Sequence, residues 1–391
     1  MPDEHALLSA SASKRWLMCP PSARLAEKFP ETTSAAAEEG TLAHTIGELM
    51  IRTKVGRVSQ TAFEDCMKNL SKSKFYCEDM REYCEEYSDF VIAEFEKAKQ
   101  KTPDAILEVE QKLDFSRWVK EGFGTGDVII IADGTLTIID LKYGKGTRVE
   151  CEHNTQMQLY ALGAYHSYGF LYEFDTVKAV IYQPRMQNIS DWHLPIVNLI
   201  EWGDHYCAPR AELAWEGKGE FGCGDWCRFC PAKNECKALA TEQLKVFDQY
   251  EEKDAALLTD AEISDILDKA DTFTNWINGI TAYAADQAIN NGRVWPNYKL
   301  VEGRSVRAFT DYSLVAAKLI ANGFQEDELY EKKPLGITAA EKLVGKKNFD
   351  PLLSEYIVKP SGKPTLAHVS DKRPALDLAK TAAETFKDVE I

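Results

Sequence analysis

Two aspartates and a lysine, Asp127, Asp140 and Lys142, have the types and spacing needed for metal-assisted hydrolysis. They lie in residues 126–142, a segment with the composition of two apolar strands joined by an Asp-Gly dipeptide at 133–134. This dipeptide favours a two-residue type I′ turn, which places Asp127 directly opposite Asp140. Lys142 comes two residues after Asp140 and therefore points to the same face. The sequence thus predicts two carboxylates and an ammonium at one end of a hairpin.

This group of charges indicates a divalent cation. Opposed carboxylates repel each other unless a positive charge lies between them, and Mg²⁺ or Mn²⁺ prefers oxygen ligands. A cation there would polarise a phosphoryl oxygen and acidify a bound water, while Lys142 would orient that water or neutralise charge in the transition state. Glu110, on the preceding apolar run, offers a further carboxylate. The alternative is an exposed hairpin whose charged ends are only solvated.

The elements that must position these residues are predicted from a change of period along the chain. Helical spacing of apolar residues predicts two N-terminal helices, at 35–50 and 80–99. Short runs rich in Ile, Val and Leu predict four strands, at 106–113, 126–132, 135–141 and 177–182. A crossover helix is predicted at 154–168. This order predicts an α/β fold with a central mixed sheet flanked by helices.

Three polar residues on the predicted helices complete the candidate site. His44 lies on the first helix, on the same face as Gly40 and Glu48, which are one turn away on either side. Gln156 and Tyr160 are one turn apart on the crossover helix. Taken singly, each of them is as readily explained as a packing residue.

Taken in order, these residues resemble the motifs of the RecB-like branch of the PD-(D/E)XK nucleases: a histidine, Gly-x-x-Asp, Asp-x-Lys, and Gln-x-x-x-Tyr. The matching segments are His44, Gly124 to Asp127, Asp140 to Lys142, and Gln156 to Tyr160. The resemblance implies a restriction-endonuclease-like core with a metal held by His44, Asp127, Asp140 and the carbonyl of Leu141. It also implies that Lys142 assists the nucleophile and that Gln156 and Tyr160 support the active site and the DNA.

A second group of residues consists of cysteines. Cys227, Cys230 and Cys236 follow a C-x2-C-x5-C pattern, which leaves a four-coordinate site one ligand short. The layout resembles that of AddB-type nucleases and of the iron-sulfur nuclease of CRISPR adaptation, which have one cysteine before the nuclease motifs and three after them. The resemblance implies a 4Fe-4S cluster with Cys19 as the fourth ligand. The alternative is a local zinc site that uses Cys223 with the other three.

Composition and charge limit the remaining possibilities. Ten cysteines in a chain without a signal peptide or a long apolar run indicate a cytoplasmic protein with metal sites, since that compartment is reducing. A net charge of -16 argues against attraction of DNA by the whole surface, although it does not exclude a DNA enzyme. The segment 331–373 is locally basic, and with the rest of the tail it resembles the end of a prophage-associated family of RecB-like proteins.

Two domains are expected at this length. Residues 1–250 are assigned to a RecB-like nuclease domain that includes the cluster cysteines, and 251–391 to a helical linker with a small basic α+β C-terminal domain. Within the latter, a helix is predicted at 260–290 and strand-like pieces at 298–301 and 305–309.

The function expected from these features is metal-dependent exonuclease cleavage of DNA ends. The ends would serve phage or prophage recombination, with a phage single-strand annealing protein as partner. One alternative is a catalytically silent iron-sulfur DNA-binding or adaptor protein, which the intact Asp127, Asp140 and Lys142 disfavour. Another is an electron-transfer protein, which no flavin or nicotinamide fingerprint supports. No phosphate loop of a helicase is present in the sequence.

Overall fold

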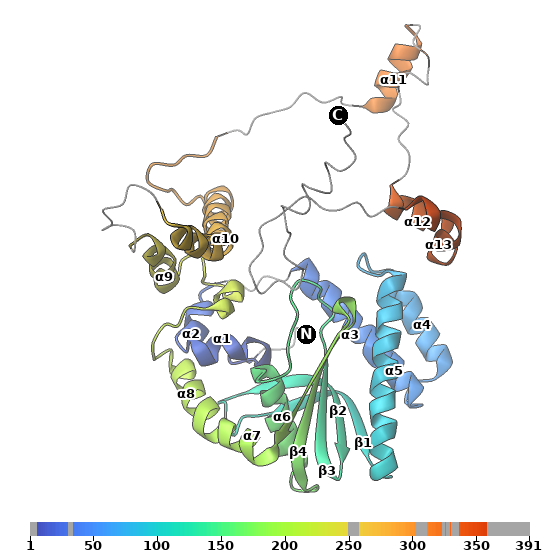
Figure 1. Ribbon diagram of the computed structural model, residues 1–391, viewed down its shortest axis with the longest axis vertical. Helices are drawn as coiled ribbons and strands as arrows, with labels where there is room; N and C mark the ends of the chain where they lie inside the picture. Colours follow the sequence, from blue (N-terminus) through green and yellow to red (C-terminus); the bar gives the residue numbers. More distant parts are fainter. Residues whose placement is uncertain are drawn as a thin grey trace, which may run out of the picture. The chain divides into compact units, whose positions relative to one another are not determined.

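The computed structural model describes residues 6–29, 34–248, 258–301, 311–322, 325, 329 and 336–357 (Figure 1). It divides into two compact units, residues 1–259 with 272–283 and residues 260–271 with 284–391. The first unit contains all the residues of the candidate site. In the part of the chain that is described, no helix is both long enough and apolar enough to cross a membrane.

A five-stranded mixed sheet forms the centre of the first unit (Figure 1). Its strands follow the order of the chain: β1 (Ile106–Asp114), β2 (Phe123–Ala132), β3 (Gly134–Leu141), β4 (Phe174–Gln183) and β5 (Asn188–Pro195). Only β3 and β4 pair in parallel; β1–β2, β2–β3 and β4–β5 are antiparallel. Helices flank the sheet, so the predicted mixed α/β fold is confirmed.

The register of the β2–β3 hairpin is the predicted one. Val128 pairs with Ile139 and Ala132 with Thr135, so the chain turns at Asp133 and Gly134. Gly134 has a φ of 70°, a left-handed conformation that glycine adopts without steric cost. Continued by one residue, the same register sets Asp127 opposite Asp140.

Both faces of the central strands are buried, which explains their continuous apolar runs. On one face, α6 (Thr155–Tyr168), the crossover helix between β3 and β4, packs Leu159 and Leu162 into the cluster that holds Ile129 and Ile138. On the other face, α3 (Ala35–Lys54) and α5 (Glu78–Lys101) pack against alternate residues such as Val128. α4 (Gln60–Leu70) packs on α3. The sheet is therefore a rigid support for side chains at its end.

The N-terminal segment lies against a region about two hundred residues further along the chain. Two short helices, α1 (Ser13–Met18) and α2 (Ser22–Ala26), pack against α8 (Ala208–Glu216). Arg210 donates to the Leu17 carbonyl at 2.8 Å, and Arg24 donates to the Trp215 carbonyl at 2.6 Å. α7 (Ile196–Trp202) and a π-helical turn, Gly203–Cys207, precede α8, and α9 (Lys237–Asp248) follows the cysteine-rich loop.

The second unit differs from the sequence prediction. Its described helices are α11 (Tyr312–Ile320), α12 (Ile337–Val344) and α13 (Lys346–Leu353), together with parts of α10 (Asp260–Asn291), which begins where a helix was predicted. The strand predicted at 298–301 is wrong: Tyr298 and Val301 are 81% and 72% exposed and pair with no strand among the described residues. The expected β part of the C-terminal region is thus absent from the described residues. The other predicted piece, 305–309, lies outside them, as do residues 331–335 and 358–373 of the basic segment.

Candidate functional site

The two aspartates lie side by side at one end of the β2–β3 hairpin, and both are buried. Asp140 is 2% exposed and Asp127 8% exposed. Asp127 Oδ2 accepts a hydrogen bond of 2.7 Å from the backbone N–H of Leu141, the residue after Asp140. This bond fixes one carboxylate oxygen of Asp127 and leaves the other free to meet a different group.

That other oxygen faces His44 and Glu110. Asp127 Oδ1 lies 3.1 Å from His44 Nδ1, and one ligand atom from each of His44, Glu110 and Asp127 lies within 4.8 Å of the others. Ligands of an octahedral cation with bonds of 2.0–2.1 Å are at most about 4.2 Å apart, so the three groups can converge on one ion after small rotations. Of the ligands that the resemblance implies, His44 and Asp127 belong to this group; Glu110, rather than Asp140, completes it.

Glu110 reaches the site through a break in β1. Its neighbours Val109 and Gln111 pair with Val128 and Gly126, but Glu110 itself has a φ of 51° and no ladder partner. A left-handed conformation costs a non-glycine residue about 1–3 kcal/mol and is found most often where function requires it. The break sits opposite Asp127 and turns the Glu110 carboxylate out of the regular alternation of the strand.

Asp140 belongs to a second network, with Lys142 and α6. Lys142 Nζ lies 2.8 Å from Asp140 Oδ2 and donates to Gln156 Oε1 at 2.9 Å. Gln156 Nε2 in turn donates to the Tyr160 hydroxyl at 3.1 Å and to Asp140 Oδ1 at 3.4 Å. The structure therefore brings together all five residues that the resemblance assigns to catalysis, Asp127, Asp140, Lys142, Gln156 and Tyr160.

One buried polar atom in this region lacks a hydrogen-bond partner, as is expected beside a cation site. Within the described chain the buried Tyr87 hydroxyl has no partner, whereas Asp140 Oδ2 is paired with the Lys142 ammonium. Tyr87, from α5, lines the same small pocket as His44, Glu110 and Asp127. A cation and its bound water would satisfy such groups. Nothing in the sequence of α5 marks Tyr87, so sequence reasoning missed it.

The pKa values of the charged side chains in the site also agree with a cation site. Burial would lower the pKa of His44, but the Asp127 and Asp140 carboxylates override it and raise that pKa to about 9. Burial and the nearby Asp127 raise the pKa of Glu110 to about 7. Burial also raises the pKa of Asp140, against the effect of the Lys142 ammonium. Protons therefore neutralise part of the charge that a divalent cation would neutralise in their place.

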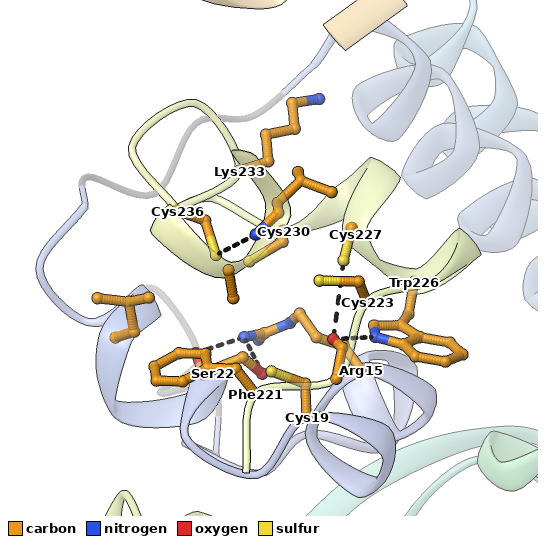
Figure 2. Close-up of a pocket in the computed structure, with 14 residues that line it drawn as sticks. Arg15, Cys19, Ser22, Phe221, Cys223, Trp226, Cys227, Cys230, Lys233 and Cys236 are labelled. Atoms are coloured by element: carbon orange, nitrogen blue, oxygen red, sulfur yellow. Dashed lines mark hydrogen bonds between the residues drawn. The ribbon is translucent and has the colours of Figure 1, made fainter. Parts of the chain in front are cut away.

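The cysteines gather at a different place, in one hollow between the N-terminal segment and the loop before α9 (Figure 2). Cys19, at the end of α1, is buried and faces the hollow from one side. The other four lie in or beside η4 (Asp225–Phe229) and face it from the opposite side, namely Cys223, Cys227, Cys230 and Cys236. The structure thus joins Cys19 to the C-x2-C-x5-C segment, and it also includes Cys223.

The chemistry of these side chains suits a thiolate-bound metal group. An all-cysteine donor set suits a tetrahedral zinc ion or a 4Fe-4S cluster. Burial raises the pKa of Cys223 to about 11 and also raises the pKa values of Cys227 and Cys230, so ligation would release protons. Because Cys19 and Cys223 line the same hollow, both candidate fourth ligands are in place.

Comparison with known proteins places the chain in a family. The model of the family described as "Protein of unknown function (DUF2800)" matches residues 5–374. The chain belongs to this family. A solved structure described as "Crystal structure of SSO0001" is 15% identical over 49% of this chain and 85% of that one, with a TM-score of 0.22, which is too low to support a conclusion. Neither description states an activity, so the resemblance to RecB-like nucleases stays a prediction.

The protonated state of the site predicts that Mg²⁺ binding by this DUF2800 member depends on pH. His44 is protonated at neutral pH because its pKa is about 9, and Glu110 is partly protonated because its pKa is about 7. Affinity should rise between pH 7 and pH 9, by about tenfold per unit for each proton displaced. Calorimetric titration with Mg²⁺ at several pH values measures this. A His44→Gln variant should lose most of the dependence, and an affinity that is flat with pH would contradict the predicted ligands.

The motif glycine Gly124 predicts a second, purely structural effect. A Cβ at this position would lie 2.9 Å from Cε1 of Tyr160, whose ring is buried and cannot move aside freely. Gly124→Ala should therefore lower the free energy of unfolding by about 1–3 kcal/mol. Gly144→Ala is the matched control, because no atom lies within 4 Å of its added Cβ. Equal stability of the two variants in chemical denaturation would show that Tyr160 does not require this glycine.

Proposed function

We propose that this protein is a Mg²⁺- or Mn²⁺-dependent deoxyribonuclease of the RecB-like PD-(D/E)XK type, acting as an exonuclease on DNA ends. The observation that supports this most is the meeting of two networks at one sheet end. One is the cation-binding group of His44, Glu110 and Asp127, and the other holds Lys142 beside Asp140. Acidic ligands next to a fixed ammonium are what hydrolysis of a phosphodiester requires.

The bound cation would polarise a phosphoryl oxygen and lower the pKa of an attacking water. Lys142 is held from two sides, by Asp140 and by Gln156, so its ammonium has little freedom before the substrate arrives. A preorganised positive charge of this kind stabilises the negative charge that develops on phosphate oxygens. Gln156 also contacts Tyr160, which keeps the amide oriented with its oxygen toward Lys142.

We further propose that Cys19, Cys227, Cys230 and Cys236 hold a 4Fe-4S cluster. The position of Cys19 in the same hollow as Cys227, Cys230 and Cys236 supports this, because the alternative zinc site does not use Cys19. Bound there, the cluster would supply a covalent link between the N-terminal segment and the loop before α9. The cluster would then connect the first and the last part of the proposed nuclease domain, residues 1–250.

The biological role that fits this activity is the preparation of single-stranded ends in phage or prophage recombination, with a single-strand annealing protein as partner. A catalytically silent adaptor would not need the Lys142 network. The basic C-terminal segment is proposed to contact the DNA backbone or this partner.

The test is digestion of labelled DNA by the purified protein. Linear single- and double-stranded DNA, labelled at either end, and covalently closed circles are incubated with Mg²⁺, with Mn²⁺ or with EDTA. An exonuclease shortens the linear molecules from an end, spares the circles and is inactive in EDTA. Cleavage of circles would replace exonuclease by endonuclease, and the absence of any metal-dependent cleavage would contradict the proposed function.

A further inference from the structure

A groove of about 880 Å³ is lined by Gln156 of the candidate site and by residues of the cysteine loop. One wall comes from α1 and the residues before it, and another from residues 147–158, which lead into α6. The remaining walls are formed by Trp202 with Tyr206 and by residues 225–231 of the cysteine loop. Gln156 lines the groove and also accepts a hydrogen bond from Lys142, so this one residue connects the groove to the catalytic network.

The lining of the groove includes four large aromatic side chains and carries no net charge. Trp202 and Tyr206 are stacked with their ring centroids 6.3 Å apart, and the cysteine loop adds Trp226 and Phe229. Phe229 is 78% exposed although it is a large apolar side chain. Three basic and three acidic side chains line the groove, so the charges cancel. Several are already paired, as in the contacts of Lys14 with Asp225 at 2.5 Å and Arg148 with Glu150 at 2.8 Å.

This lining selects among the nucleic acids that could occupy it. A duplex presents phosphates and hides the faces of its bases, so it is bound through basic side chains, which this groove lacks in excess. A single strand exposes its base faces, and stacking on an aromatic side chain contributes about 1–3 kcal/mol per base. The groove is therefore matched to unpaired bases and not to a double helix.

We propose that a single strand of DNA lies in this groove, with its bases stacked on Phe229 and its aromatic neighbours, and enters the active site past Gln156. The proposal rests on the proposed nuclease function, whose substrate class it narrows. Phe229 lies between Cys227 and Cys230, and Arg228 donates to the Thr147 hydroxyl on another wall at 3.3 Å. The cysteine site and this hydrogen bond together set the position of the stacking side chain.

The test compares two exposed phenylalanines in the full-length protein. Phe170 is 77% exposed, like Phe229, but it lies beyond the C-terminal end of α6 and does not line the groove. Binding of fluorescent oligothymidine and of a hairpin duplex is measured by anisotropy in EDTA, where metal-dependent cleavage does not occur. Phe229→Ala should weaken single-strand binding by about five- to a hundredfold. Phe170→Ala should leave single-strand binding unchanged, and duplex binding should respond to neither variant.

The salt dependence of single-strand affinity is a second, independent measurement on the same complex. Because stacking releases few counterions, single-strand affinity should fall only weakly with salt concentration, unlike affinity that depends on phosphate contacts. Equal loss of binding in both variants, a steep salt dependence, or equally tight binding of duplex would overturn the proposal. Tight, Phe229-dependent binding without any cleavage in Mg²⁺ would instead reject the nuclease function and keep the groove. Normal cleavage together with unchanged single-strand binding in a Phe229→Ala variant would reject the groove and keep the nuclease function.

Discussion

Asp140→Asn is expected to lower metal-dependent DNA cleavage by about a thousandfold. The side chain keeps its size, so the packing at the end of β3 is preserved. What is lost is the buried negative charge whose Oδ2 lies 2.8 Å from the Lys142 ammonium. Without that charge, the cation loses a nearby anion and the lysine loses the partner that holds it.

The matched control for this experiment is Asp191→Asn. Asp191 lies on β5, in the same sheet, but its side chain is exposed and is not part of either network. Initial rates on end-labelled DNA at saturating Mg²⁺ are compared for both variants and the unchanged protein, with circular dichroism as a check on folding. Full activity in Asp140→Asn would exclude this hairpin as the catalytic centre, even if the protein still cut DNA.

The hairpin shows what could be predicted from the sequence and why. An Asp-Gly turn between two apolar strands restricts the loop to two residues, so one short motif determines the partner of every residue in both strands. The observed pairing of Val128 with Ile139 confirms that register. The apolar runs of β2 to β4 were equally clear because most of their residues are buried under helices on both faces of the sheet.

Other features depend on tertiary context that has no local signal. β5 was not predicted, because it is an edge strand in which half-buried and exposed side chains alternate and its composition is polar. The left-handed backbone of Glu110 is imposed by the pairs on either side of it and by nothing in its neighbouring residues. In the C-terminal part, Tyr298–Val301 has the composition of a strand, but it pairs with no strand in the described chain. Composition alone does not make a strand, because a strand also needs a partner in a sheet.

Cys19→Ala and Cys223→Ala are expected to have opposite outcomes, because the cluster and the zinc alternative use different fourth ligands. If a 4Fe-4S cluster is held by Cys19 and the C-x2-C-x5-C segment, Cys19→Ala should lose its iron and acid-labile sulfide, while Cys223→Ala should retain both. A local zinc site predicts the reverse pattern for zinc. Iron, zinc and sulfide are measured on protein purified without oxygen.

The two variants should also differ in stability. A link from Cys19 to the loop at 227–236 closes a segment of about two hundred residues, and such a cross-link contributes about 5 kcal/mol by restricting the unfolded chain. A site confined to residues 223–236 closes a much shorter loop, with a contribution of about 3 kcal/mol. Cys207→Ala is the control for the loss of a buried thiol, because Cys207 is fully buried and lies outside the hollow.

Cys19→Ala should therefore unfold at clearly lower denaturant concentration than Cys207→Ala when both are purified without oxygen, under conditions in which the unchanged protein carries its cluster. It should also bind single-stranded DNA less tightly, since Phe229 stands between two of the ligands and loses its fixed position with the cluster. If Cys19→Ala keeps its metal and its stability, the N-terminal segment is held only by contacts such as those of Arg210 and Arg24 with backbone carbonyls. The cysteine site would then be a local element of the loop, independent of the nuclease core.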